Sequence, residues 1–429
     1  MTTRPASEIR TLFLSSLGGA LEFYDFVIFV FFTTVLAKLF FPPTLPDWVR
    51  QLDTFGIFAA GYLARPLGGI VMAHFGDLRG RKRMFTFSIL LMAIPTLLIG
   101  LLPTYQSIGV AAPILLLVMR VTQGIAMGGE APGGWVFVAE HARPGRTGLA
   151  VGLLTSGLSL GILIGSLVAT TVNVLFTTAQ IAASIWRLPF LIGGAFGFIA
   201  MFLRRWLQET PVFEEIRHRA AISRELPLRV VFRNHGRSIA ASILSTWMLS
   251  AAIVVVILMT PALLQQLFKL PARETQLANL AGSAALCLST LAVGAACDRF
   301  GLRRVTPPAI ALLIAGTYAL YLGAERFPSA LVLLYFIAGL GAGAAVLTPI
   351  LMVHAFPPPV RFSGVSFSYN VALAGIGGVT PLLVSWLVHW NRLSPAYYVT
   401  FAAVLGIVAT KIADFETAWV ETVETEAAA

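Results

Sequence analysis

The feature that most limits what this chain can fold into is a series of apolar stretches, each bounded by charged residues, proline or glycine. An α-helix rises about 1.5 Å per residue, so about 20 apolar residues are needed to cross the hydrocarbon core of a bilayer. Hydrophobic residues make up 57% of the chain and charged residues only 12%, which excludes an ordinary soluble domain. We therefore predict an all-α membrane protein with twelve transmembrane helices, at residues 12–37, 51–75, 84–103, 111–140, 146–176, 187–207, 237–266, 275–297, 304–324, 328–355, 362–390 and 395–413.

The net charge of +10 does not indicate a nucleic-acid-binding protein, because the basic residues stand in short clusters between the apolar stretches. We expect no nucleic-acid partner. The two cysteines, Cys287 and Cys297, fall in one apolar stretch and match neither a disulfide framework nor a metal-ligand pattern. We expect no metal site and no cofactor.

The charges of the loops predict the orientation of the chain. If both termini lie on one side of the membrane, 21 of the 30 Lys and Arg residues lie on that side and 7 on the other, with Arg65 and Arg120 inside predicted helices. Cytoplasmic loops are enriched in Lys and Arg, so both termini are predicted to be cytoplasmic. The longest polar interval, 208–236, is predicted to be a cytoplasmic linker between two six-helix bundles, 1–207 and 237–429.

The first predicted helix carries two carboxylates, Glu22 and Asp25, in an otherwise apolar stretch. Their i, i+3 spacing places them on one helix face, about 4.5 Å apart along the axis. A charged carboxyl at the centre of a membrane helix costs roughly 2.5 kcal/mol or more, so such a residue normally faces an aqueous path or a partner. We interpret the two acids either as a proton-carrying or substrate-facing pair, or as part of a structural ion pair with a neighbouring helix.

A short loop motif occurs twice in the chain. Residues 77–83 (DLRGRKR) and 298–304 (DRFGLRR) follow the second and eighth predicted helices, at an offset of 221 residues. A repeat at half the chain length predicts two homologous halves around a central site, as in many transporters. Each loop places an acid and several cations at helix ends, which predicts a latch that breaks when the halves move, unless the charges serve only topology. The residues predicted to form these latches are Asp77, Arg81, Asp298 and Arg303.

Twelve helices with this doubled Asp-x-x-Gly loop and its trailing cations resemble the major facilitator superfamily. Several further stretches resemble, more narrowly, its metabolite:proton symporter family, and the resemblance covers nearly the whole chain. These stretches are 21–26 (LEFYDF), 65–69 (RPLGG), 120–124 (RVTQG), 128–130 (GGE), 186–190 (WRLPF), 209–213 (ETPVF), 356–357 (FP), 360–364 (VRFSG) and 369–370 (YN).

This resemblance implies two pseudo-symmetric six-helix bundles in the bacterial inner membrane. It also implies import of a small organic acid, a zwitterionic osmolyte or a related metabolite, driven by proton entry. The sequence departs from the family pattern at three positions. Ala73 and Leu78 stand where the first loop usually has Gly and Arg, which predicts a weaker latch there, and His354 stands where an acid is expected.

Five charged residues lie deep in the predicted helices, all of them in the first half: Glu22, Asp25, Arg65, Arg120 and Glu130. Arg is the preferred bidentate partner of a carboxylate, so the two arginines are predicted to bind a substrate carboxylate while the three acids carry protons. Asp25 and Arg65 lie at similar depths and can meet. The alternative is that the arginines only neutralise the acids. The uncharged residues predicted to join the substrate site are Tyr24, Gln123, Tyr369 and Asn370.

The leading hypothesis is a proton-coupled secondary transporter that imports a small, carboxylate-bearing metabolite. Its closest alternative is a proton antiporter that exports an anionic toxin or drug, since the same fold and charges serve either direction. An enzyme is not expected, because we recognise no nucleophile with a base and no metal cluster at a membrane face. The chain also lacks the Gly-x-x-x-x-Gly-Lys-Ser/Thr stretch of an ATP-driven pump. The expected partners are the substrate, protons and the lipid bilayer, and we expect a monomer.

Overall fold

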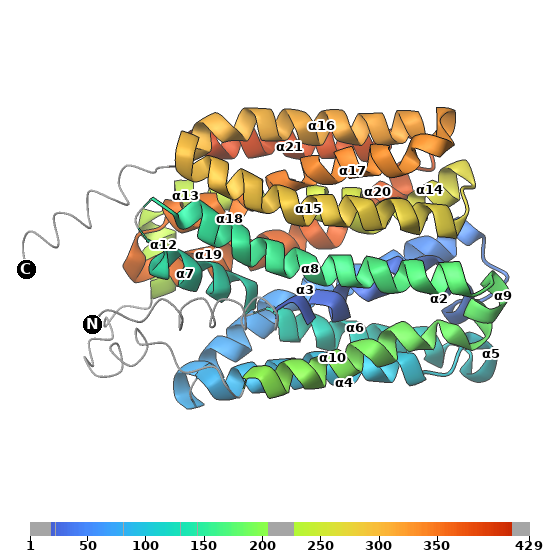
Figure 1. The fold of residues 1–429 in the computed structure, drawn as a ribbon. Coiled ribbons are helices and arrows are strands. Elements are labelled where there is room, and N and C mark those ends of the chain that lie inside the picture. The colour runs from blue at the N-terminus through green and yellow to red at the C-terminus, as the bar shows by residue number, and fades with distance from the viewer. Residues whose placement is uncertain are drawn as a thin grey trace, which may run out of the picture.

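A computed structural model describes residues 19–21, 23–79, 81–128, 130–143, 145–204 and 227–413. These residues are almost entirely helical, and no strand occurs among them. Figure 1 shows the long helices lying along one common direction, with most of the first half, in blue to green, below most of the second half, in yellow to red. The predicted all-helical class is confirmed.

The first half begins with a helix over Gly19–Phe31 that bends by 61° into α2 (Thr33–Phe40). The elements that follow are α3 (Asp47–Arg79), α4 (Arg81–Leu101), α5 (Tyr105–Ile108), α6 (Ala111–Met127), α7 (Glu130–His141), α8 (Thr147–Leu175), α9 (Thr178–Gln180), a π-helical turn (Ile181–Ile185) and α10 (Arg187–Arg204).

The second half contains two π-helical segments, Ala251–Met259 and Leu373–Gly377, each continuous with the α-helices on either side of it. The α-helices are α12 (Pro227–Asn234), α13 (Gly236–Ser250), α14 (Thr260–Phe268), α15 (Ala272–Phe300), α16 (Leu302–Arg326), α17 (Leu331–Ala342), α18 (Leu347–Ala355), α19 (Pro358–Ala372), α20 (Gly378–Leu387) and α21 (Ser394–Ile412). Short 3₁₀ turns, Pro328–Ala330 and Gly343–Val346, lie on either side of α17.

Eight helices in the described part of the chain are long and apolar enough to cross a membrane, and two bent helix pairs bring the number to ten. With α3 and α4, these helices correspond in order to the twelve predicted ranges. Large apolar side chains such as Leu63, Leu175 and Leu333 are exposed, as expected for a surface in contact with lipid tails. The chain is therefore a multi-pass membrane protein.

The two halves meet along α8 and α15, which lie side by side in the centre of Figure 1. Near the start of α8, a methyl group added to Gly148 would lie 2.4 Å from the carbonyl oxygen of Gly294, so the backbones nearly touch. Toward the other end, the Ser166 hydroxyl donates a hydrogen bond of 2.8 Å to Oδ1 of Asn279. The two helices are therefore packed together over most of their length.

Within the first half, α3 and α6 cross at a contact made by glycines. A methyl group added to Gly124 would lie 1.9 Å from the carbonyl oxygen of Gly61, and one added to Gly68 would lie 1.8 Å from that of Ile125. Side chains larger than hydrogen would force the helices apart, because small residues are what allow such close approach. This crossing places the two buried arginines, one on each helix, in the same region.

We predict that Gly124→Ala destabilises the protein by about 1–3 kcal/mol, the usual cost of overpacking a well-packed contact. The matched control is Gly375→Ala, because no atom outside its own helix lies within 4 Å of the added methyl group. The check is the melting temperature of both purified variants in detergent. Equal melting temperatures would show that the α3–α6 crossing adapts to the added methyl group.

Candidate substrate and proton site

Arg120, on α6, is fully buried in the first half. Three phenylalanine rings surround its guanidinium group, with Cζ 4.4 Å from the ring centre of Phe26, 4.6 Å from Phe29 and 5.0 Å from Phe58. Cation–π contacts of this kind are worth about 2 kcal/mol or more when the cation is desolvated. The rings therefore offset part of the cost of burying this charge.

The hydrogen bonds of Arg120 leave one edge of its guanidinium group unused. Nη1 donates to the carbonyl oxygen of Phe26 at 3.2 Å and to Oε1 of Gln123 at 2.7 Å, and Nε2 of Gln123 donates to the Thr96 hydroxyl at 2.7 Å. Nε and Nη2 of Arg120 have no hydrogen-bond partner among the described residues. Gln123, predicted to touch substrate, thus lies in a chain of hydrogen bonds that orients Arg120.

Arg65, on α3, is also buried and also leaves an edge unused. Its Cζ lies 5.7 Å from the ring centre of Tyr62 and 5.4 Å from that of Tyr369. Nε and Nη2 are buried without a hydrogen-bond partner in the described part of the chain. Because Tyr369 belongs to α19, the Arg65 site is built from both halves.

Two further polar groups lie around Tyr369. The ring of Trp135, on α7, packs edge-on against it with centroids 4.9 Å apart, and its buried indole N–H has no described partner. Asn370 donates from Nδ2 to the carbonyl oxygen of Gly128 at 2.6 Å, while its Oδ1 is buried and unpaired among described residues. The predicted pair Tyr369 and Asn370 therefore contacts the first half beside Arg65.

Asp25 is fully buried and does not meet Arg65, so the predicted contact between them is wrong for this structure. Its carboxylate faces α10, where a methyl group added to Gly193 would lie 2.6 Å from Oδ1 and one added to Gly197 would lie 3.4 Å from Oδ2. Neither oxygen has a hydrogen-bond partner among the residues described. The next residue, Phe26, carries the carbonyl group that Arg120 binds.

Tyr24 lies with Asp25 and away from the two arginines. Its hydroxyl donates to the carbonyl oxygen of Pro189 at 2.8 Å, and its ring packs against Phe196 with centroids 5.2 Å apart. Both partners belong to α10. The predicted role of Tyr24 in substrate binding thus has no geometric support, and the side chain joins the first helix to α10.

Four predicted residues cannot be compared with the structure. Glu22 lies outside the described residues, and so do the side chains of Glu130, Asp77 and Arg81. Their roles stay predictions.

The second copy of the loop motif joins the two halves. Gly301 connects α15 to α16 with a φ of 83°, in the left-handed region that favours glycine. Asp298, near the end of α15, accepts hydrogen bonds from the backbone N–H groups of Gly148 at 2.6 Å and Leu149 at 2.7 Å. The carboxylate therefore binds the positive end of α8, where negative charge is stabilised.

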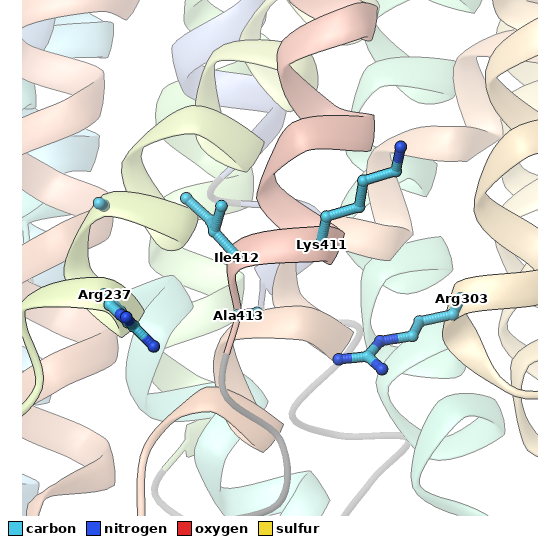
Figure 2. Close-up of a pocket in the computed structure, with 6 residues that line it drawn as sticks. Arg237, Arg303, Lys411, Ile412 and Ala413 are labelled. Carbon is cyan, nitrogen blue, oxygen red and sulfur yellow. The ribbon is translucent and has the colours of Figure 1, made fainter.

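Arg303, the other predicted residue of this loop, lines a cavity of about 470 Å³ in the second half. Figure 2 shows Arg303 and Arg237 on opposite sides of the end of α21, which carries Lys411. Ala240, Ile412 and Ala413 complete the lining. This basic cavity is formed by the ends of α13, α16 and α21 and is separate from the residues around Arg65 and Arg120.

Apart from Tyr369, the aromatic residues around the arginines are not among the predicted site residues. The signal was present on α3, where Phe58, Tyr62 and Arg65 follow the i, i+4, i+7 spacing of one helix face. No local pattern marks Trp135, because its contact with α19 depends on how the halves pack. Within the described residues, no three His, Cys, Asp or Glu side chains gather as a metal site requires.

Comparisons with known proteins agree with this architecture. A family model described as Major Facilitator Superfamily matches residues 27–271. A putative proline/betaine transporter of Staphylococcus aureus is 32% identical and covers 95% of this chain and 89% of its own length. A citrate-proton symporter of Klebsiella pneumoniae is 31% identical and covers 96% of this chain and 93% of its own length.

A solved structure has the same fold. The crystal structure of a D-xylose-proton symporter superposes with a TM-score of 0.72, at 16% sequence identity, over 95% of this chain and 98% of that one. At this identity the likeness concerns the fold.

We predict that Asp298→Asn separates the start of α8 from the end of α15 in a larger share of molecules. The substitution removes the negative charge from the N-terminus of α8, and couplings of this kind are worth about 1–3 kcal/mol. The measurement is the distance distribution between spin labels at the ends of α7 and α18. The control is Glu325→Gln, because Glu325 pairs with Arg392 on an exposed surface of the second half. If both variants give the wild-type distribution, Asp298 does not hold this end closed.

Proposed function

Because the chain belongs to the major facilitator superfamily, we propose that it is a proton-coupled secondary transporter that imports a small, carboxylate-bearing metabolite by alternating access. One observation carries this proposal: Arg65 and Arg120 are buried, and each has an unpartnered guanidinium edge among the described residues. The names of two relatives, a putative proline/betaine transporter and a citrate-proton symporter, support a small charged solute.

The proposed substrate-binding groups are the two arginines. Nε and Nη2 lie on one edge of a guanidinium group, so their N–H bonds fit the two oxygens of a carboxylate. Leaving such donors unpaired in a buried site is costly, and a substrate carboxylate would satisfy them. Tyr369 and Asn370 would couple substrate binding to movement of the second half, because they contact Arg65 and Gly128 across the interface.

The proposed proton carrier is Asp25, together with Glu22 and Glu130. A carboxyl group without an ion-pair partner can bind or release a proton without breaking a salt bridge, and Asp25 has none in the described part. Arg120 binds the carbonyl group of Phe26, the next residue along the helix. A change of charge at Asp25 therefore acts on the same turn of helix that holds the substrate-binding arginine.

Alternating access requires two bodies that separate on one face and close on the other. We assign these bodies to residues 1–207 and 237–429, joined by the linker 208–236, with both termini in the cytoplasm of a bacterium and the protein in its inner membrane. Asp298 and Arg303, with Asp77 and Arg81 in the first half, are proposed to form the latches of the cytoplasmic face. The protein is proposed to act as a monomer.

We predict that Asp25→Asn abolishes accumulation driven by a pH gradient but retains exchange of labelled for unlabelled substrate, because exchange needs no net proton movement. The substrate for the assay is chosen by a thermal-shift screen of carboxylates and zwitterions, since a bound ligand raises apparent stability. The check is uptake into proteoliposomes, and Asp47→Asn is the control because Asp47 pairs with Arg50 on an exposed surface. Proton-driven accumulation by Asp25→Asn at the wild-type level would show that Asp25 does not couple transport to protons. Proton-driven depletion of the substrate by the wild-type protein would indicate an exporter.

We also predict that Arg65→Lys and Arg120→Lys each weaken substrate binding by about tenfold or more. Lysine keeps the charge but loses the planar pair of donors, and hydrogen bonds to charged groups are worth about 1.5–3 kcal/mol. Calorimetry on the purified variants measures the affinity. The control is Arg187→Lys. Arg187 lies at the start of α10, and its guanidinium group already donates to the carbonyl oxygens of Gly100 and Leu102. Wild-type affinity in both test variants would contradict the bidentate contact.

A further inference from the structure

Both buried arginines present the same unused edge in the same structure. In Arg65 and in Arg120 the unpartnered atoms are Nε and Nη2, the pair that accommodates a carboxylate side-on. In Arg120 the opposite nitrogen, Nη1, is held by Phe26 and Gln123, so the free edge has a defined orientation. Two such edges can bind two anionic groups at once.

The two edges lie in one region of the first half. Nη2 of Arg120 lies 3.8 Å from the position of a methyl group added to Gly61. Gly61 precedes Arg65 by four residues on α3, a rise of about 6 Å. Between them Tyr62 contacts the Phe26 ring beside Arg120, with centroids 5.2 Å apart, and lies against the Arg65 guanidinium. Tyr62 therefore lies between the two sites, against the Arg65 guanidinium and against the ring that the Arg120 guanidinium contacts.

The surroundings of the edges favour a second anion over a cation. Asp25, which precedes the residue whose carbonyl group binds Arg120, faces the glycines of α10. The aromatic rings, which attract cations, already lie against the two guanidinium groups. An ammonium group placed between the arginines would meet two positive charges, whereas a second carboxylate would meet the donors that lack partners.

We propose that the substrate is a short dicarboxylate that bridges the two arginines, with one carboxylate on Nε and Nη2 of Arg65 and the other on Nε and Nη2 of Arg120. This inference rests on the proposed function, because it assigns the chemistry of the same site. It separates this chain from a carrier of zwitterions such as proline or betaine, in which a single carboxylate is paired with a cationic nitrogen.

The test compares succinate with succinamate, in which an uncharged amide replaces one carboxylate at nearly constant shape. Calorimetry on the purified wild-type protein should show succinate binding at least tenfold more tightly, with malonate, glutarate and adipate defining the best spacing. Proline and betaine should bind no more tightly than succinamate. Equal affinity for succinate and succinamate, or tighter binding of proline or betaine, overturns the dicarboxylate inference while leaving a carboxylate transporter in place. Binding of none of these compounds overturns the proposed function as well.

Variants then assign the two carboxylates to the two arginines. Arg65→Gln and Arg120→Gln should each reduce the preference for succinate over succinamate to less than threefold, while succinamate still binds the remaining arginine. Retained succinamate binding shows that the variant is folded. The control, Arg392→Gln, removes an exposed cation that pairs with Glu325 and should keep the full preference. A full preference in both test variants overturns the bridge.

Discussion

The structure depends on two guanidinium groups buried without a described carboxylate partner. A cation in an apolar interior is expensive unless hydrogen bonds and dipoles replace its water shell. Around Arg120 this replacement is partial: three phenylalanine rings, one carbonyl oxygen and Gln123 contact the group, and one edge keeps no partner. Such an incomplete environment is costly in the empty protein and favours binding of an anion, which is the property that a carrier of organic acids needs.

Packing places these groups. The glycines of α3 and α6 let the two helices approach until Gly124 meets the backbone of Gly61, and this contact places the arginines of both helices in one region of the first half. The second half contributes Tyr369 to the Arg65 site through α19. Because the site is shared between halves that are expected to move, the contacts that substrate makes to each half can differ between conformations. Such a difference is what allows a ligand to shift a conformational equilibrium.

In the proposed mechanism, proton transfer and substrate binding use different faces of the first helix. Asp25 faces α10, while the backbone carbonyl group of Phe26 accepts a hydrogen bond from Arg120. This arrangement separates the acid from the cation that it would otherwise neutralise, and it connects the two through a single turn of helix. Asp298 belongs to the second half and lies far from both arginines in sequence. Its carboxylate accepts hydrogen bonds from the N-terminus of α8 in the first half. The groups proposed for binding, coupling and closure are thus separate charged residues.

The sequence by itself determined the number and order of the membrane helices, because hydropathy over 20 residues is a local property. It also identified Arg65, Arg120, Asp25 and Asp298, since charge is rare and conspicuous in such a chain. Only the tertiary structure decided which of these groups meet. Asp25 turns to α10 and not to Arg65, Tyr24 binds α10, and Gln123 orients Arg120. These outcomes depend on the rotation and crossing of helices far apart in sequence, which close packing at a few small residues sets and which no single helix encodes.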